Sequence, residues 1–203
     1  ISYEIADQQI ADAIEAGFEY IVIPVPPMGM FTYDFETRAM GMNGTTETLI
    51  EFLSVVGEKA SNAGIQLLYH NHDFEFKTDA DGVTLVDRIL SETNPEHVNF
   101  QIDLFWATVA GADPIEYFGK YPGRFKAFHV KDRNADGNMA PVGKGEIQNI
   151  IIEITSWLAD NLPRWASFSM KESGKYLGFI LGTKVADKSW IKPVSKWQKR
   201  AVT

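Results

Sequence analysis

The sequence predicts a parallel α/β fold. Along the first 150 residues, short apolar runs that suit buried strands alternate with segments whose apolar residues recur at helical spacing. Each strand and helix together occupy roughly 30 residues, about the size of a βα unit. Because the alternation is regular, we expect parallel βα repeats within one sheet and not a set of separate domains.

The first unit and the segment after it occupy residues 4–44. A helix is predicted at 4–17, where Ile5, Ile10 and Ile14 fall near helical spacing. The continuous β-branched run at 20–25 predicts a strand that is buried on both faces, as in parallel sheets. Residues 26–44 are rich in Gly, Met and aromatic side chains without any period, so we expect a long and functional loop.

The second unit begins with a clear helix start. Thr45 predicts an N-cap for a helix that runs to about residue 63. A strand at 65–69 follows it. The helix carries one apolar stripe that should face the core: Leu49, Phe52, Leu53, Val56 and Ala60.

The remaining units lie between residues 84 and 130. The patterns predict a helix at 84–90, a strand at 98–103, a short helix at 114–121 with proline in its first turn, and a strand at 125–130. The order of elements therefore continues to alternate.

Polar residues that can bind a metal stand where three of these strands end. His70 and His72 follow the second strand, Asp103 ends the third and His129 lies near the end of the fourth. The carboxyl ends of parallel strands meet at one edge of a sheet, so these side chains should converge, whereas His97 precedes its strand and should lie at the other edge. Imidazole and carboxylate together suit Mn²⁺, Zn²⁺ or Co²⁺.

A structural role for each histidine is the competing interpretation. One histidine at a strand end is more often a hydrogen-bonded structural residue than a ligand. Four such groups at the ends of three successive strands are harder to explain by packing, because burying polar groups without partners costs free energy. Jointly they favour a site.

Composition excludes several classes of protein. The chain has no cysteine, so any metal must be bound by His, Asp, Glu or water. No apolar run reaches the ~18 residues that a membrane span needs. Residues 1–150 hold 10 basic and 23 acidic side chains, and this negative charge argues against non-specific binding of nucleic acid.

The segment 151–203 differs from the rest. It holds nine basic and four acidic residues and four of the five tryptophans. We therefore divide the chain into 1–150 and a divergent basic segment, 151–203. The basic residues fit a solvated tail best, with polyanion binding as the alternative.

Five blocks in the first part resemble the sugar phosphate isomerase/epimerase family of xylose-isomerase-like TIM barrels. The resemblance covers roughly residues 10–147. The blocks are YHNHDFEF at 69–76, DLFW at 103–106, YPGRF at 121–125, HVKD at 129–132 and VGKG at 142–145.

The resemblance implies a (β/α)8 barrel with a divalent metal: Mn, Zn, Co or Mg. Asp103 and His129 match two ligand positions of the family. His70 stands where relatives carry a glutamate ligand, and Glu75 is the alternative at that place. The fourth ligand of the family, a glutamate, has no clear counterpart.

The resemblance also gives roles to the neighbouring residues. His72 is expected to act as general acid/base or to bind substrate, and Lys131 to act in catalysis through an electrostatic contact. Trp106 would form an apolar wall for a sugar ring, and Asp132 would accept a hydrogen bond behind the ligands at the substrate site. A surface ion pair is the alternative role for Lys131 and Asp132.

Two departures from the family lead to a hypothesis of a partial barrel. A complete barrel needs roughly 250 residues, and we expect the first strands to be absent from this chain, which begins with Ile1. The divergent segment 151–203 would arise from a reading-frame change or a chimeric gene. We expect a cytoplasmic protein, unless an export signal lies upstream, and open strand edges that favour a homo-oligomer.

These expectations define a functional hypothesis and its rivals. The first is a metal-dependent isomerase or epimerase acting on a small-molecule sugar or keto-sugar through an enediolate-like intermediate, with dehydration and glycoside elimination as related outcomes. The second is an inactive or purely binding fragment of such a barrel. The third is a DNA repair enzyme like endonuclease IV, against which the few histidines and the acidic charge argue.

Overall fold

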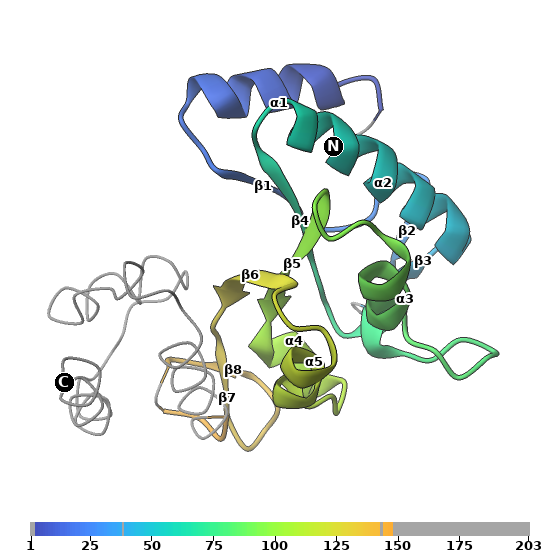
Figure 1. Ribbon diagram of the computed structural model, residues 1–203. Helices are drawn as coiled ribbons and strands as arrows, with labels where there is room; N and C mark the ends of the chain where they lie inside the picture. Colours follow the sequence, from blue (N-terminus) through green and yellow to red (C-terminus); the bar gives the residue numbers. More distant parts are fainter. Residues whose placement is uncertain (1–2, 38, 143, 148–203) are drawn as a thin grey trace, which may run out of the picture.

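The computed structural model describes residues 3–37, 39–142 and 144–147 (Figure 1). The predicted basic segment 151–203 lies outside the described residues. Within the described part, no helix is long and apolar enough to cross a membrane.

Four parallel strands form the central sheet, as the sequence predicted. They are β1 (Tyr20–Ile23), β4 (Gln66–His70), β5 (Val98–Asp103) and β6 (Phe125–His129), in the order β1-β4-β5-β6. All three pairings are parallel, so the carboxyl ends of the strands lie at one edge of the sheet. The α/β fold is confirmed.

Helix α2 (Thr46–Asn62) is the longest helix among the described residues and packs against β4 and β5. The Thr45 hydroxyl accepts a hydrogen bond from the Thr48 main-chain N–H, which is the predicted N-cap. All five residues of the predicted apolar stripe are buried. Gly57 lets the helix approach β5 closely, because a Cβ there would lie 2.6 Å from Val98 Cγ2.

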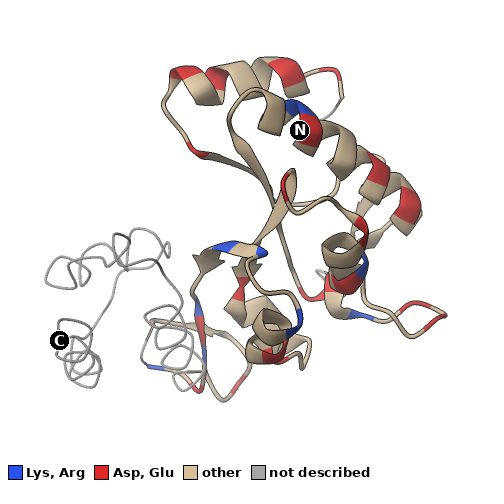
Figure 2. Cartoon of the chain, viewed as in Figure 1, with Lys and Arg blue, Asp and Glu red and all other residues tan. Residues whose placement is uncertain are grey.

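Helix α1 (Ala6–Glu15) lies beside α2 (Figure 1). Its buried face differs from the predicted one: Ala6, Ile10 and Ala13 are buried, whereas Ile5 and Ile14 are exposed. Acidic side chains outnumber basic ones on these two helices (Figure 2). This surface would repel a phosphate backbone.

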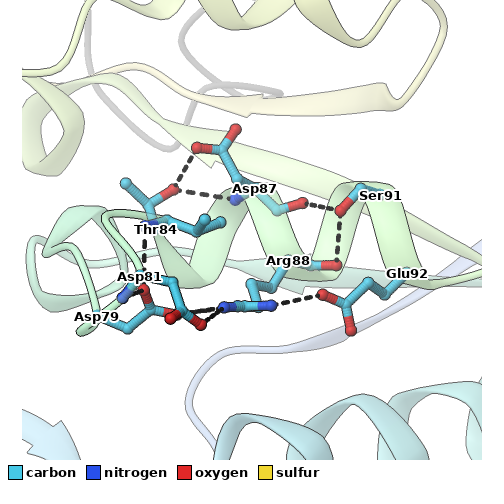
Figure 3. A network of polar contacts seen from close by, with 8 residues as sticks. Asp79, Asp81, Thr84, Asp87, Arg88, Ser91 and Glu92 are labelled. Atoms are coloured by element: carbon cyan, nitrogen blue, oxygen red, sulfur yellow. Dashed lines mark hydrogen bonds and ion pairs between the residues drawn. The ribbon is translucent and has the colours of Figure 1, made fainter.

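Helix α3 (Leu85–Glu92) packs against α2 and begins at the N-cap Thr84. Arg88 on α3 forms ion pairs with Asp79, Asp81 and Glu92 (Figure 3). The Asp79 and Asp81 pairs fasten the preceding turn to the helix. On the next unit, Lys120 of α5 (Pro114–Lys120) pairs with Asp87 at 2.7 Å.

The predicted strand at 20–25 is shorter than expected and is not buried on both faces. Tyr20 is 40% exposed, and only Ile23 of β1 is fully buried. The reason is position: β1 lies at the edge of the described sheet and pairs there only with β4. A continuous apolar run did not distinguish an edge strand from a central one.

The segment predicted as a loop at 26–44 contains a small antiparallel hairpin. Its strands are β2 (Phe31–Tyr33) and β3 (Met40–Met42). Each is three residues long, too short to produce a readable alternation. Met28 and Phe35 are almost fully exposed beside it.

Four further short elements were not predicted. Helix α4 (Leu104–Val109) starts directly after β5, and a 3-10 turn, η1 (Phe74–Phe76), follows β4. Strands β7 (Asp132–Arg133) and β8 (Met139–Ala140) pair after β6.

Candidate metal centre

Three side chains from three neighbouring strands converge at the carboxyl edge of the sheet. His70, Asp103 and His129 are the last residues of β4, β5 and β6. Asp103 and His129 are direct partners in the parallel register. One potential ligand atom from each of the three residues lies within 4.8 Å of the others. The structure thus brings together the three residues that the sequence selected as ligands.

Asp103 uses its two carboxylate oxygens differently. Oδ1 accepts hydrogen bonds from the main-chain N–H groups of Phe105 and Trp106, at 3.1 and 3.2 Å, and so caps α4. Oδ2 faces the cluster, 3.3 Å from His129 Nδ1 and 3.8 Å from His70 Nε2. The helix cap therefore fixes the carboxylate with its other oxygen directed toward the cluster.

His70 is held as a neutral imidazole. Burial lowers its pKa to about 4, and its neighbours His72, His129 and Lys131 act in the same direction against the attraction of Asp103. Its Nδ1 lies 3.0 Å from Gln101 Oε1. With the proton on Nδ1, where Gln101 accepts it, Nε2 presents its lone pair to the cluster.

The charge of Asp103 is stabilised despite its burial. Burial alone would raise the pKa of Asp103, but contacts with His129 and Lys131 outweigh it and lower the pKa. Lys131 Nζ lies 2.6 Å from Oδ2. The carboxylate is therefore ionised at neutral pH, as a metal ligand must be.

The donor set fits a divalent metal ion. Asp103 Oδ2 forms an ion pair with Lys131, but neither this oxygen nor His129 Nδ1 has a well-directed hydrogen bond, although the two atoms are buried and lie only 3.3 Å apart. Buried polar atoms are rarely left in this state unless a ligand or ion completes them. Two imidazoles and one carboxylate suit Zn²⁺, Mn²⁺ or Co²⁺ better than Ca²⁺.

Asn71 joins the ends of the two central strands. Its Oδ1 accepts a hydrogen bond from the Asp103 main-chain N–H at 2.9 Å, and its Nδ2 donates to the Asp103 carbonyl at 3.3 Å. The side chain is completely buried. Because both contacts fall on Asp103, this amide fixes the distance between the β4 and β5 parts of the cluster.

His72, Trp106 and Lys131 line one side of the cluster. The His72 ring lies 5.1 Å from the His70 ring and 5.5 Å from the Trp106 ring, measured between centroids. Lys131 Nζ lies 6.0 Å from the Trp106 ring. The side chain of His129 is 36% exposed, so solvent or a small molecule reaches the cluster from its side.

Glu75, the alternative ligand, lies outside the cluster. It is fully buried, and it accepts hydrogen bonds from the Tyr69 hydroxyl at 2.9 Å and from the His72 main-chain N–H at 2.7 Å. Burial raises the pKa of Glu75 to about 8, against the lowering effect of these hydrogen bonds. Of the two residues predicted for the first ligand position, the structure brings His70 and not Glu75 into the cluster.

Asp132 is bound by the main chain that follows it. Its carboxylate is fully buried and accepts hydrogen bonds from the main-chain N–H groups of Arg133, Gly145 and Ile147. These contacts fasten the end of the described chain to the segment after β6. The sequence predicted Asp132 as a hydrogen-bond acceptor at the substrate site; in the structure it accepts from main-chain N–H groups, and a role toward substrate stays a prediction.

Sequence reasoning missed Gln101 and Asn71. Both are polar residues within or directly after an otherwise apolar strand. A polar residue at such a position was the available sign of a specific hydrogen-bonding role. His97 lies before β5, as expected, and takes no part in the cluster.

Comparison with known proteins extends this picture. The profile of the xylose isomerase-like TIM barrel family matches residues 2–174. An inosose dehydratase of Lacticaseibacillus casei is 31% identical over 86 residues, which are 42% of this chain and 28% of that protein.

Solved structures give the same result for the fold. A sugar phosphate isomerase/epimerase from Parabacteroides distasonis is similar with a TM-score of 0.57 and 27% identity, over 75% of this chain and 51% of that one. A xylose isomerase-like TIM barrel protein from Mycobacterium smegmatis, in complex with magnesium, matches with a TM-score of 0.51 and 18% identity, over 74% and 55% of the two chains. The matched region thus spans about half the length of these structures. The chain belongs to the xylose isomerase-like TIM barrel family.

Proposed function

We propose that the chain carries the divalent-metal site of an enzyme that removes a proton next to the carbonyl of a sugar or keto-sugar. One observation carries this proposal: His70, Asp103 and His129, the last residues of three neighbouring strands, bring potential ligand atoms within 4.8 Å of one another. The names of the relatives, which are sugar isomerases, epimerases and dehydratases, support the substrate class.

Each residue around the cluster has a defined part in this chemistry. A bound divalent cation would supply Lewis-acid stabilisation of negative charge on a substrate oxygen. Burial lowers the pKa of His72, so its imidazole is neutral and able to accept a proton. The Lys131 ammonium would hold a second substrate oxygen, and the Trp106 ring offers an apolar surface to the sugar ring.

The fate of the abstracted proton decides the reaction. Its return at another carbon gives isomerisation, and its return on the opposite face gives epimerisation. Loss of a hydroxyl at the β-carbon gives dehydration, which the similarity to an inosose dehydratase favours as the second candidate. All three reactions share the first step, and the residues described above serve that step.

Hydrogen exchange tests the shared step directly. The protein with Mn²⁺ is incubated in D₂O with a panel of ketoses and an inosose, and substrate protons are followed by NMR. We expect loss of the signal next to the carbonyl for one substrate class, and at least a tenfold slower loss with His72→Gln. Metal binding without exchange on any panel member would instead support the fragment that binds without turnover.

A further inference from the structure

Glu75 is a buried acid that the proposed chemistry does not use. It lies in η1, directly after the turn that carries His72, and none of its surface is exposed. Phe74 and Phe76 on either side of it are also buried. A carboxyl group in such surroundings costs free energy unless its oxygens find donors.

Both oxygens of Glu75 find donors, and the two donors lie on different parts of the chain. Oε1 accepts from the hydroxyl of Tyr69, inside β4, and Oε2 accepts from the main-chain N–H of His72, beyond the end of β4. The carboxyl group therefore ties the turn after the strand back to the strand itself. It spans His70, which lies between the two donors in sequence.

The His72 ring depends on the shape of this turn. It lies nearly parallel to the Phe74 ring, with an interplanar angle of 13°, and its other neighbours are His70 and Trp106. β4 ends at His70, so no strand pairing fixes the main chain at His72.

We propose that Glu75 is a positioning residue that, through the His72 main-chain N–H and the Tyr69 hydroxyl, fixes the turn that places the His72 imidazole beside Trp106. The catalytic role of His72 rests on the proposed function, but the position of the His72 ring does not. The metal ligands stand at the ends of β4, β5 and β6, which other contacts hold, so metal affinity should not depend on Glu75.

The chemistry of the contact provides three matched variants. Glu75→Gln keeps an oxygen for the His72 N–H and offers an N–H₂ group to the Tyr69 oxygen. Glu75→Leu removes both contacts and fills a similar volume with apolar atoms. Glu75→Asp keeps the carboxyl group but shortens it by one methylene, so that it no longer spans both donors.

The test is the NMR contact between the His72 and Trp106 rings, recorded on the full chain without metal or substrate. We expect the cross-peak and the His72 ring shifts to persist in Glu75→Gln and to be lost or displaced in Glu75→Leu and Glu75→Asp. Calorimetry should show Mn²⁺ dissociation constants within about threefold of wild type in all variants. Where exchange activity is present, it should fall at least tenfold in Glu75→Leu and recover in Glu75→Gln.

Unchanged His72 shifts in both Glu75→Leu and Glu75→Asp would overturn the proposal. If Glu75→Leu does not fold cooperatively, Glu75→Asp carries the comparison with Glu75→Gln. A wild-type protein without exchange activity would contradict the proposed function but leave the ring contact, and hence the positioning role, measurable.

Discussion

The two ends of the β5 and β6 pair both bury charged side chains, but they satisfy them differently. At the amino end, Arg124 donates hydrogen bonds to the Leu90 carbonyl, the Thr93 hydroxyl and the Val98 carbonyl. At the carboxyl end, Asp103 Oδ2 pairs with the Lys131 ammonium and lies 3.3 Å from His129 Nδ1 without a directed hydrogen bond between the two.

This difference indicates that the amino end contributes mainly to stability and the carboxyl end to ligand binding. Three oxygens accept hydrogen bonds from the two terminal nitrogens of the Arg124 guanidinium, although its Nε has no partner. At the other end, His70, Asp103 and His129 bring potential ligand atoms within 4.8 Å of one another, beside the Lys131 ammonium. The same contrast separates residues that an α/β fold needs from residues that a site needs.

The largest effect on stability is expected at the amino end of the β5 and β6 pair. Arg124→Met should lower the free energy of unfolding by about 2–4 kcal/mol, because the oxygens that Arg124 serves lose their charged donor. Urea denaturation measures this loss, and calorimetry on the folded variant should find unchanged Mn²⁺ affinity. A variant with wild-type stability and weakened metal binding would reverse the comparison.

The next largest effect is expected at the carboxyl end of the strand pair. Asp103→Asn should weaken Mn²⁺ binding by about 100-fold, which corresponds to about 2.7 kcal/mol. The amide oxygen still caps α4, so the free energy of unfolding should change by less than in Arg124→Met. Retained affinity, measured by calorimetry, would exclude Asp103 as a ligand.

The buried carboxyl group of Glu75 should make the stability of the fold depend on pH. Its folded pKa of about 8 lies above the ordinary value of 4.5, so the unfolded chain releases this proton first as pH rises. Between about pH 4.5 and 8, Glu75 should therefore reduce stability by about 1 kcal/mol for each pH unit. Urea denaturation across this range should show wild type losing stability relative to Glu75→Gln; a constant difference would argue that Glu75 is ionised in the fold.

The smallest effect is expected from Gln101. Gln101→Leu removes the acceptor at His70 Nδ1 and should weaken Mn²⁺ binding by about tenfold, because the imidazole loses its orientation and preferred tautomer. Gln101→Glu keeps an acceptor and serves as the control in the same titration. Equal affinities of the leucine variant and wild type would show that His70 needs no such support.

Much of the sheet was predictable because local signals agreed with the fold. The apolar stripe of α2, its Thr45 cap and the buried run of β5 each follow from residue spacing alone. The β2 and β3 hairpin did not, since three-residue strands leave no period to detect. Helix α4 was missed because its start depends on the side chain of Asp103, which the sequence indicated as a ligand and not as a cap.

The convergence of His70, Asp103 and His129 was predictable from strand order, because parallel topology fixes which strand ends meet. The surroundings of single residues were not. Asp132, Glu75 and Asp103 all accept hydrogen bonds from main-chain N–H groups, but only Asp103 of the three also directs a carboxylate oxygen at the cluster. The sequence does not distinguish a carboxylate that binds only its surroundings from one that also belongs to a site.

A calorimetric titration with Mn²⁺ of wild type, His129→Ala and His97→Ala tests the central claim most directly. His97 lies before β5, at the edge opposite the cluster, so it is the matched control for a lost imidazole. The account predicts one saturable site in wild type and His97→Ala and a loss of about 100-fold or more in His129→Ala. Absence of binding in wild type, or equal affinity in all three proteins, would contradict it.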